Sequence, residues 1–71
     1  MAQDIRLRIG ARIRKLRLKH GWTQVVLAEH LGLDRSYLAD VERGKRNISI
    51  VNVEIIAKGF RLTLSQLFSR L

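Results

Sequence analysis

The side chains of this sequence that could do chemistry are cationic and polar, and they concentrate between residues 23 and 47. Two short amphipathic segments, 24–31 and 35–43, flank the turn Gly32-Leu33-Asp34. The second segment opens with Arg35 and is followed at once by a basic run. Guanidinium, ammonium and amide groups bond phosphate oxygens and the edges of bases. The chemistry available here is therefore the recognition of a polyanion.

The same inventory speaks against catalysis and metal binding. The chain has no cysteine, and His20 and His30 have no second acid at ligand spacing, so we interpret them as surface or cap histidines. The sequence contains no nucleophile–base–acid set and no phosphate-cradling glycine loop. We therefore expect no metal, no cofactor and no enzyme activity. An RNA partner would need an aromatic stacking platform, which the pattern does not provide.

Composition sets the outer limits of the interpretation. With 71 residues, of which 46% are hydrophobic, we expect one small core and a single domain over residues 1–71. The net charge of +8 indicates nucleic acid or an anionic membrane surface as partner. No apolar run approaches transmembrane length, and the N-terminus has no signal-peptide core. We therefore expect a cytoplasmic protein that does not bind a membrane.

Residues 4–19 predict a basic amphipathic helix. Its apolar stripe recurs at spacings of four, four and three, and consists of Ile5, Ile9, Ile13 and Leu16. Gly10 lies inside this helix and should weaken it by about 1 kcal/mol relative to alanine. Gly21 should end it in the left-handed conformation that glycine adopts readily.

The remaining helices are predicted from caps and periodicity. Good N-cap residues precede each apolar segment, namely Thr23, Asp34, Ser49 and Thr63. The helix that Ser49 caps should run to Phe60, with an inner stripe of Ile50, Val53, Ile56, Ala57 and Phe60. A last short helix begins at Thr63, with Gln66 completing a capping box, and returns Leu67 and Phe68 to the core. Because strand-type alternation is weak throughout, we expect an all-α fold of five helices.

The two segments at the turn have the layout of a helix-turn-helix motif, in which the second helix is presented to a DNA groove. The pattern resembles the Cro/cI-type (XRE) helix-turn-helix family, the lambda-repressor-like DNA-binding domain. The resemblance covers about residues 9–68 and is carried by RKLRLKHGWTQVVLAEHLGLDRSYLADVERGKRNIS and IIAKGFRLTLSQLF. Within the family, the chain is most similar to the controller proteins of restriction–modification systems. Departures from the family pattern are Val25-Val26, Ile55 and Arg61.

The resemblance implies a sequence-specific transcriptional regulator of a bacterium or phage, bound as a homodimer to a palindromic operator in double-stranded DNA, with RNA polymerase as a further candidate partner. It also implies a buried ion pair of Arg17 with Glu42 that fixes the recognition helix. The alternative is an antitoxin-like protein-interaction module with secondary DNA binding. An added partner-binding segment would favour that alternative, and the sequence shows none.

Individual roles follow from side-chain chemistry. Arg35 can bond guanine bidentately, whereas Ser36 discriminates weakly. Asp40 either accepts from cytosine or orients Arg35 or Arg43, and we favour orientation because a carboxylate near phosphates is costly. Thr23 is an N-cap or a phosphate ligand, and Tyr37 is a phosphate or thymine contact or a half-buried core ring. The expected DNA-binding set is Thr23, Gln24, Arg35, Ser36, Tyr37, Ala39, Asp40, Arg43, Lys45, Arg46 and Asn47.

A dimer surface is expected in the C-terminal part of the chain, because apolar residues remain there once the core stripes are assigned. The candidates are Val51, Ile55, Leu64, Phe68 and Leu71. The competing interpretation is that these are scattered surface residues of the ordinary kind.

Overall fold

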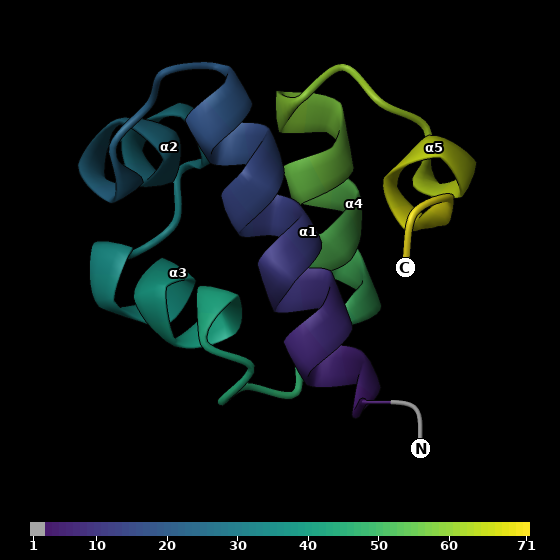
Figure 1. The fold of residues 1–71 in the computed structure, drawn as a ribbon. Coiled ribbons are helices and arrows are strands. Elements are labelled where there is room, and N and C mark those ends of the chain that lie inside the picture. Colours follow the sequence, from purple (N-terminus) through teal and green to yellow (C-terminus); the bar gives the residue numbers. More distant parts are fainter. Residues whose placement is uncertain (1–2) are drawn as a thin grey trace.

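The computed structural model describes residues 3–71, and this part of the chain consists of helices joined by short turns. The helices are α1 (Ile5–Lys19), α2 (Gln24–Leu31), α3 (Arg35–Glu42), α4 (Ile50–Gly59) and α5 (Leu64–Phe68). α1 and α4 run through the middle of the molecule, with α2 and α3 on one side and α5 on the other (Figure 1). The prediction of an all-α, five-helix fold is confirmed. Within residues 3–71, no helix is both long and apolar enough to span a bilayer.

Side-chain caps begin the helices where the sequence predicted them. Thr23, Asp34, Ser49 and Thr63 each accept a hydrogen bond from the backbone N–H three residues on, at 3.0–3.1 Å. Gln66 completes the capping box by accepting from the backbone N–H of Thr63 at 2.9 Å. Each bond satisfies a donor that a helix N-terminus leaves unpaired. Local sequence therefore sets where the elements start.

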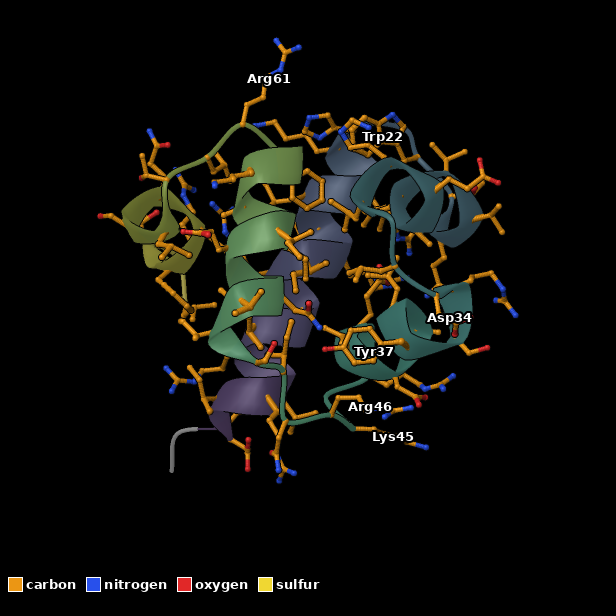
Figure 2. The ribbon with its side chains drawn as sticks, turned by 180° about the vertical axis from the view of Figure 1, so that it is seen from behind. Trp22, Asp34, Tyr37, Lys45, Arg46 and Arg61 are labelled. Carbon is orange, nitrogen blue, oxygen red and sulfur yellow. The ribbon has the colours of Figure 1, made fainter. Side chains whose placement is uncertain are left out.

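The ends of α1 and α4 use the same conformation with different residues. Gly21 follows α1 with φ 71°, and the Trp22 N–H returns to the Arg17 carbonyl. Arg61 follows α4 with φ 58°, and it is the one non-glycine residue with positive φ among residues 3–71. The departure from the family pattern at Arg61 therefore places a side chain where glycine would be unstrained. Figure 2 shows the exposed Arg61 side chain pointing away from the rest of the molecule.

The core lies between the helices, and its largest fully buried side chains are Ile13, Leu27, Leu38, Ile56, Leu67 and Val41. Three residues predicted for the core lie outside it. Ile5 is 50% exposed, Ile50 67% and Phe68 38%. Ile5 and Ile50 occupy the first turns of α1 and α4, where the apolar stripe extends past the elements that cover it. Periodicity predicts a face, but it does not predict how far a partner covers that face.

Gly10 also has a different role from the one predicted. A Cβ atom built at this position would lie 2.3 Å from the Val41 carbonyl oxygen and 2.7 Å from that of Glu42. α3 therefore approaches α1 closely because Gly10 has no side chain. Alanine would relieve the conformational cost of glycine, but the clash with the backbone of α3 outweighs that gain.

Candidate nucleic-acid interface

The turn between α2 and α3 fixes the angle at which α3 leaves the scaffold. Gly32 has φ 70°, and the Leu33 N–H closes the turn on the Ala28 carbonyl at 2.9 Å. Asp34 then caps α3 by accepting from the Tyr37 N–H at 3.1 Å. Helix α3 packs on both α1 and α2. One face of this short helix is therefore buried, and the opposite face is free.

A buried ion pair joins α1 to the end of α3. The Arg17 guanidinium donates to both carboxylate oxygens of Glu42, at 2.7 and 3.0 Å, and to the Trp22 carbonyl at 2.9 Å. The side chains are only 10% and 2% exposed, respectively. The hydrogen bond to Glu42 raises the pKa of Arg17 above its ordinary value. This bidentate pair holds the C-terminal end of α3 at a fixed place on the scaffold.

Gln24, a member of the expected DNA-binding set, belongs to the same network in this structure. Its Nε2 donates to Glu42 Oε1 at 3.2 Å. The contact fixes the first residue of α2 relative to α3 and consumes one of the two amide hydrogens. Thr23, just before it, is exposed and acts as the N-cap of α2 through Val26. Both side chains lie at the positive end of the α2 dipole, which suits an anion.

The outward face of α3 begins with Arg35 and Ser36, which are both exposed. Tyr37 is half-buried, and its hydroxyl accepts from Asn52 Nδ2 on α4 at 3.0 Å. Ala39 is only 8% exposed and offers little surface to a groove. The exposed polar side chains of this face therefore lie in its first turn.

Asp40 gathers the cations that follow α3. It accepts from the guanidinium of Arg43 and, at 3.3 Å, from Arg46 Nε. Arg46 also lies over the Tyr37 ring, 5.4 Å from its centroid. The hydrogen bond from Arg43, helped by that from Arg46, holds the pKa of Asp40 below its ordinary value. Among residues 3–71 the ion-pair partners of Asp40 are Arg43 and Arg46, and Arg35 is not one of them.

Lys45 and Asn47 complete the loop. Gly44 has φ 75° and turns the chain so that the Lys45 N–H bonds the Asp40 carbonyl at 2.9 Å. No acidic partner of Lys45 occurs within residues 3–71. Asn47 Oδ1 accepts from Arg6 Nη1 at 3.5 Å. Figure 2 shows Tyr37, Lys45 and Arg46 together at one end of the molecule, far from Trp22 and Arg61.

The predicted dimer residues do not form one uniform surface. Val51 and Phe68 are exposed, whereas Ile55, Leu64 and Leu71 are half-buried, with Leu64 and Leu71 packed against the core. Ile5, Ile50 and Phe68 line one apolar groove with Ile9, Ile48 and Val53. The sequence analysis assigned Ile5 and Ile50 to the core, so it missed this extension. The only available signal was their place in first turns.

Two supporting contacts also escaped the sequence analysis. Asn52 holds the Tyr37 hydroxyl from another helix, and Arg6 reaches Asn47 across 41 positions. Neither spacing has a local signature, because both contacts exist only once the helices have packed.

Comparison with known proteins agrees with this geometry. Residues 13–67 match the Helix-turn-helix family model. The chain belongs to this family. It is 46% identical over 67 residues to the control protein C.MunI of Mycoplasma sp, with 93% of this chain and 90% of that protein covered. The prediction of an XRE-type protein similar to restriction–modification controllers is confirmed.

Solved structures of controller proteins have the same fold. The restriction–modification controller C.AhdI from Aeromonas hydrophila superposes with a TM-score of 0.84 at 43% identity, covering 89% of this chain and 96% of that one. The C.Esp1396I tetramer, solved in complex with its natural 35 base-pair operator, gives a TM-score of 0.86 at 34% identity, covering 96% and 90% of the two chains. Relatives of this chain are therefore regulatory proteins, and one has been seen on its operator.

Proposed function

We propose that this protein is a sequence-specific DNA-binding transcriptional regulator that binds a palindromic operator as a homodimer, as a controller protein of a restriction–modification system. The observation that carries the proposal is the free face of α3. It presents Arg35 and Ser36 and continues into a cationic loop, while a buried ion pair fixes its far end. A rigid helix with exposed donors in its first turn suits the major groove.

The relatives support the DNA partner. C.MunI is named a control protein, and the C.Esp1396I complex contains operator DNA. Both proteins are covered over nearly their whole length by this chain, so the similarity is not confined to a shared module. We infer from this that the chain acts as a single regulatory unit in the cytoplasm and is not an enzyme.

In the proposed complex, specificity and affinity come from different residues. Arg35 selects guanine by donating to O6 and N7, and Ser36 assists. The cations of the following loop bond phosphates and set the register of α3 on the duplex. Thr23, Gln24 and Asn47 add neutral contacts to the backbone, and the N-terminus of α2 favours a phosphate beside it. The Tyr37 ring positions Arg46, which lies over it, and the Tyr37 hydroxyl contacts the DNA backbone.

Dimerisation supplies the second half-site. A palindrome read by two recognition helices places its half-sites about 34 Å apart or at a multiple of that distance. We propose that Val51 and Phe68 are central to the contact and that Ile5 and Ile50 extend it, because these four side chains are exposed. Ile55, Leu64 and Leu71 are half-buried and contribute the less exposed part of the dimer contact. RNA polymerase is a proposed further partner, since a regulator acts at a promoter.

The experiment that tests this function is selection from a random duplex library at near-physiological salt, followed by sequencing. We expect an enriched palindrome, and its half-site spacing gives the dimer geometry. Binding without an enriched motif would replace the proposal with nonspecific DNA binding, and no binding at all would replace it with a protein partner.

The dimer is tested separately by sedimentation of Val51→Lys against Val26→Lys. Both valines are exposed, at 64% and 43%, so neither change should unfold the monomer. We expect only Val51→Lys to shift the protein towards monomer and to weaken operator binding. Equal behaviour of the two variants would move the interface away from α4.

A further inference from the structure

A second cationic surface lies on the side of α1 that faces away from α3. Arg8, Arg12, Lys15 and Lys19 follow one another at spacings of four, three and four, which places them on one helix face. Gly10 and Arg17, which contact α3, lie about half a turn round the helix from this face. Figure 1 shows α3 and α5 on opposite sides of α1. A duplex bound along α3 therefore does not cover this stripe.

The stripe lines a groove that α1 shares with the C-terminal end of the chain. Six of the fourteen lysines and arginines line this groove, namely Arg8, Arg12, Arg14, Lys15, Lys19 and Arg70, and no aspartate or glutamate of residues 3–71 does. Within residues 3–71, none of the six has an ion-pair partner. The α3 side differs, because there Asp40 and Glu42 neutralise part of the charge. Arg12 donates to the backbone carbonyls of Leu67 and Gln66, at 3.0 and 3.1 Å. The positive charge without a carboxylate partner is therefore most available on the other five side chains.

Two further features distinguish the groove from an ordinary solvated surface. Arg8 Nε is buried and has no hydrogen-bond partner among residues 3–71. A buried donor without an acceptor is costly, and a ligand oxygen would relieve it. The groove also has apolar lining, with Leu62, Leu71 and buried Leu16 beside Leu18, which is 51% exposed. Apolar surface between cations suits a ligand that brings both carboxylates and aliphatic groups.

We propose that this groove docks an acidic, amphipathic segment of a partner protein, with carboxylates on the arginines and lysines and aliphatic side chains on Leu18 and its neighbours. A nucleic-acid backbone would satisfy the charges but would leave the leucines without a partner. A second copy of this chain fits poorly, because it has six carboxylates and four of them, Asp4, Asp40, Glu42 and Glu54, already pair with cations of their own chain. The proposal does not depend on the operator-binding function, since the two surfaces lie on opposite sides of α1.

The test uses a fluorescein-labelled helical peptide of glutamate and leucine, with a leucine at every third or fourth position. From Arg8 to Lys19 the stripe spans about 16 Å, so a peptide of about eleven residues matches it. Fluorescence anisotropy of the full chain reports binding. A second peptide, with serine in place of leucine, keeps the charge and removes the aliphatic groups. We expect the first peptide to bind and the second to bind several-fold more weakly. Absence of binding, or equal binding of the two, would overturn the proposal.

Matched variants locate the site. Lys15→Glu changes the groove, and Lys58→Glu makes the same charge change at an exposed lysine on α4 outside it. We expect Lys15→Glu to lower peptide affinity on the order of fivefold, because an attraction becomes a repulsion, and Lys58→Glu to have a much smaller effect. Leu18→Ser should weaken binding while leaving the melting temperature almost unchanged, because half of that side chain is already exposed. Equal losses for Lys15→Glu and Lys58→Glu would show that only net charge matters.

Competition separates this surface from the DNA interface. We expect the peptide to bind the free protein and the protein saturated with duplex DNA about equally. Displacement of the peptide by duplex would overturn the proposal, because it would place both ligands on one surface. If Lys15→Glu lowers duplex affinity as much as Lys45→Glu does, the groove binds nucleic acid and the peptide proposal fails. A peptide that binds while the library yields no motif would separate failure of the operator function from failure of this one.

Discussion

Arginine meets carboxylate in two clusters on neighbouring parts of α3, and the clusters differ in their access to water. Arg17 and Glu42 have side chains only 10% and 2% exposed. In the other cluster, the side chain of Asp40 is 28% exposed and those of Arg43 and Arg46 are 59% and 50% exposed. The same chemistry therefore serves two purposes. The buried pair is a fixed strut between α1 and α3. In the proposed complex, a phosphate replaces the carboxylate partner of the exposed cations.

The comparison is tested most strongly by breaking the strut. Glu42→Ala leaves the Arg17 guanidinium buried without its carboxylate, which should cost about 3–5 kcal/mol. A domain of this size is stable by only about 4–11 kcal/mol, so this variant should be close to unfolding at room temperature. Chemical denaturation followed by circular dichroism measures the change. Glu54→Ala is the control, because it breaks an exposed pair with Lys58 at 3.6 Å and should cost less than about 0.5 kcal/mol. Similar losses in both variants would remove the distinction between the clusters.

The close approach that the strut secures is tested at Gly10. Gly10→Ala places a Cβ atom 2.3 Å from the Val41 carbonyl oxygen, so α1 and α3 must separate. We expect a loss of about 1–3 kcal/mol, although alanine is the better helix former. Ala11→Gly, at an exposed site on the next residue of α1, removes helix propensity without touching α3 and should cost about 1 kcal/mol. Stabilisation by Gly10→Ala would show that the contact between the helices is looser than the structure indicates.

Gly10 and Glu42 mark the difference between what local sequence predicts and what it does not. Caps, glycine stops and apolar spacing predicted all five helices, because each signal is local and acts within one turn. Gly10 was interpreted by helix propensity alone, and its contact with α3 was missed, because the α3 backbone that approaches it lies some 30 positions away in the sequence. Ile5 and Ile50 were assigned to the core for the same reason, since periodicity cannot say which turn of a helix lacks a cover. The family resemblance supplied the Arg17–Glu42 pair, and no spacing argument could have done so.

Arg35 lies on the same exposed side of α3 as the second cluster but is not paired with Asp40. Arg35→Ala should reduce discrimination between the operator and a site with a changed guanine by about 1–3 kcal/mol, because one bidentate contact is lost. The fold should be unaffected, since this side chain is exposed. Competition binding with single-base variants of the selected operator measures the effect. Ser36→Ala is the neighbouring control and should change discrimination much less. An equal loss on every sequence would assign Arg35 to the backbone instead of the bases.

Lys45 should behave in the opposite way. Lys45→Ala removes a cation that has no acidic partner within residues 3–71, so it should weaken binding to all duplexes alike. We expect the slope of log affinity against log salt to fall by about 1 in magnitude. Lys58→Ala, on α4, removes a similar charge outside the interface and should leave the slope nearly unchanged. A sequence-dependent loss would mean that Lys45 reaches a base edge.

The smallest effect is expected at the carboxylate that the exposed cations share. The Arg43 hydrogen bond lowers the pKa of Asp40 from its ordinary value of 3.8. Ionised Asp40 therefore stabilises the fold at pH values above 3.8, and this stabilisation is lost as the pH falls through the lower pKa of the folded state. Asp40→Asn should therefore flatten the pH dependence of stability below about pH 4. It should also raise nonspecific duplex affinity slightly, because Arg43 and Arg46 become available to phosphates.

Asp4→Asn separates these two consequences. The hydrogen bond from Arg6 lowers the pKa of Asp4 to about 2, so this substitution should also flatten the acid limb. Asp4 caps α1 and pairs with Arg6, so its loss should leave the ion pairs of Arg43 and Arg46 with Asp40 intact. Any change in duplex affinity should then come only from Arg6, which also contacts Asn47. If Asp40→Asn weakens nonspecific binding instead, the carboxylate is needed to position its arginines, and the exposed cluster is as much a strut as the buried pair.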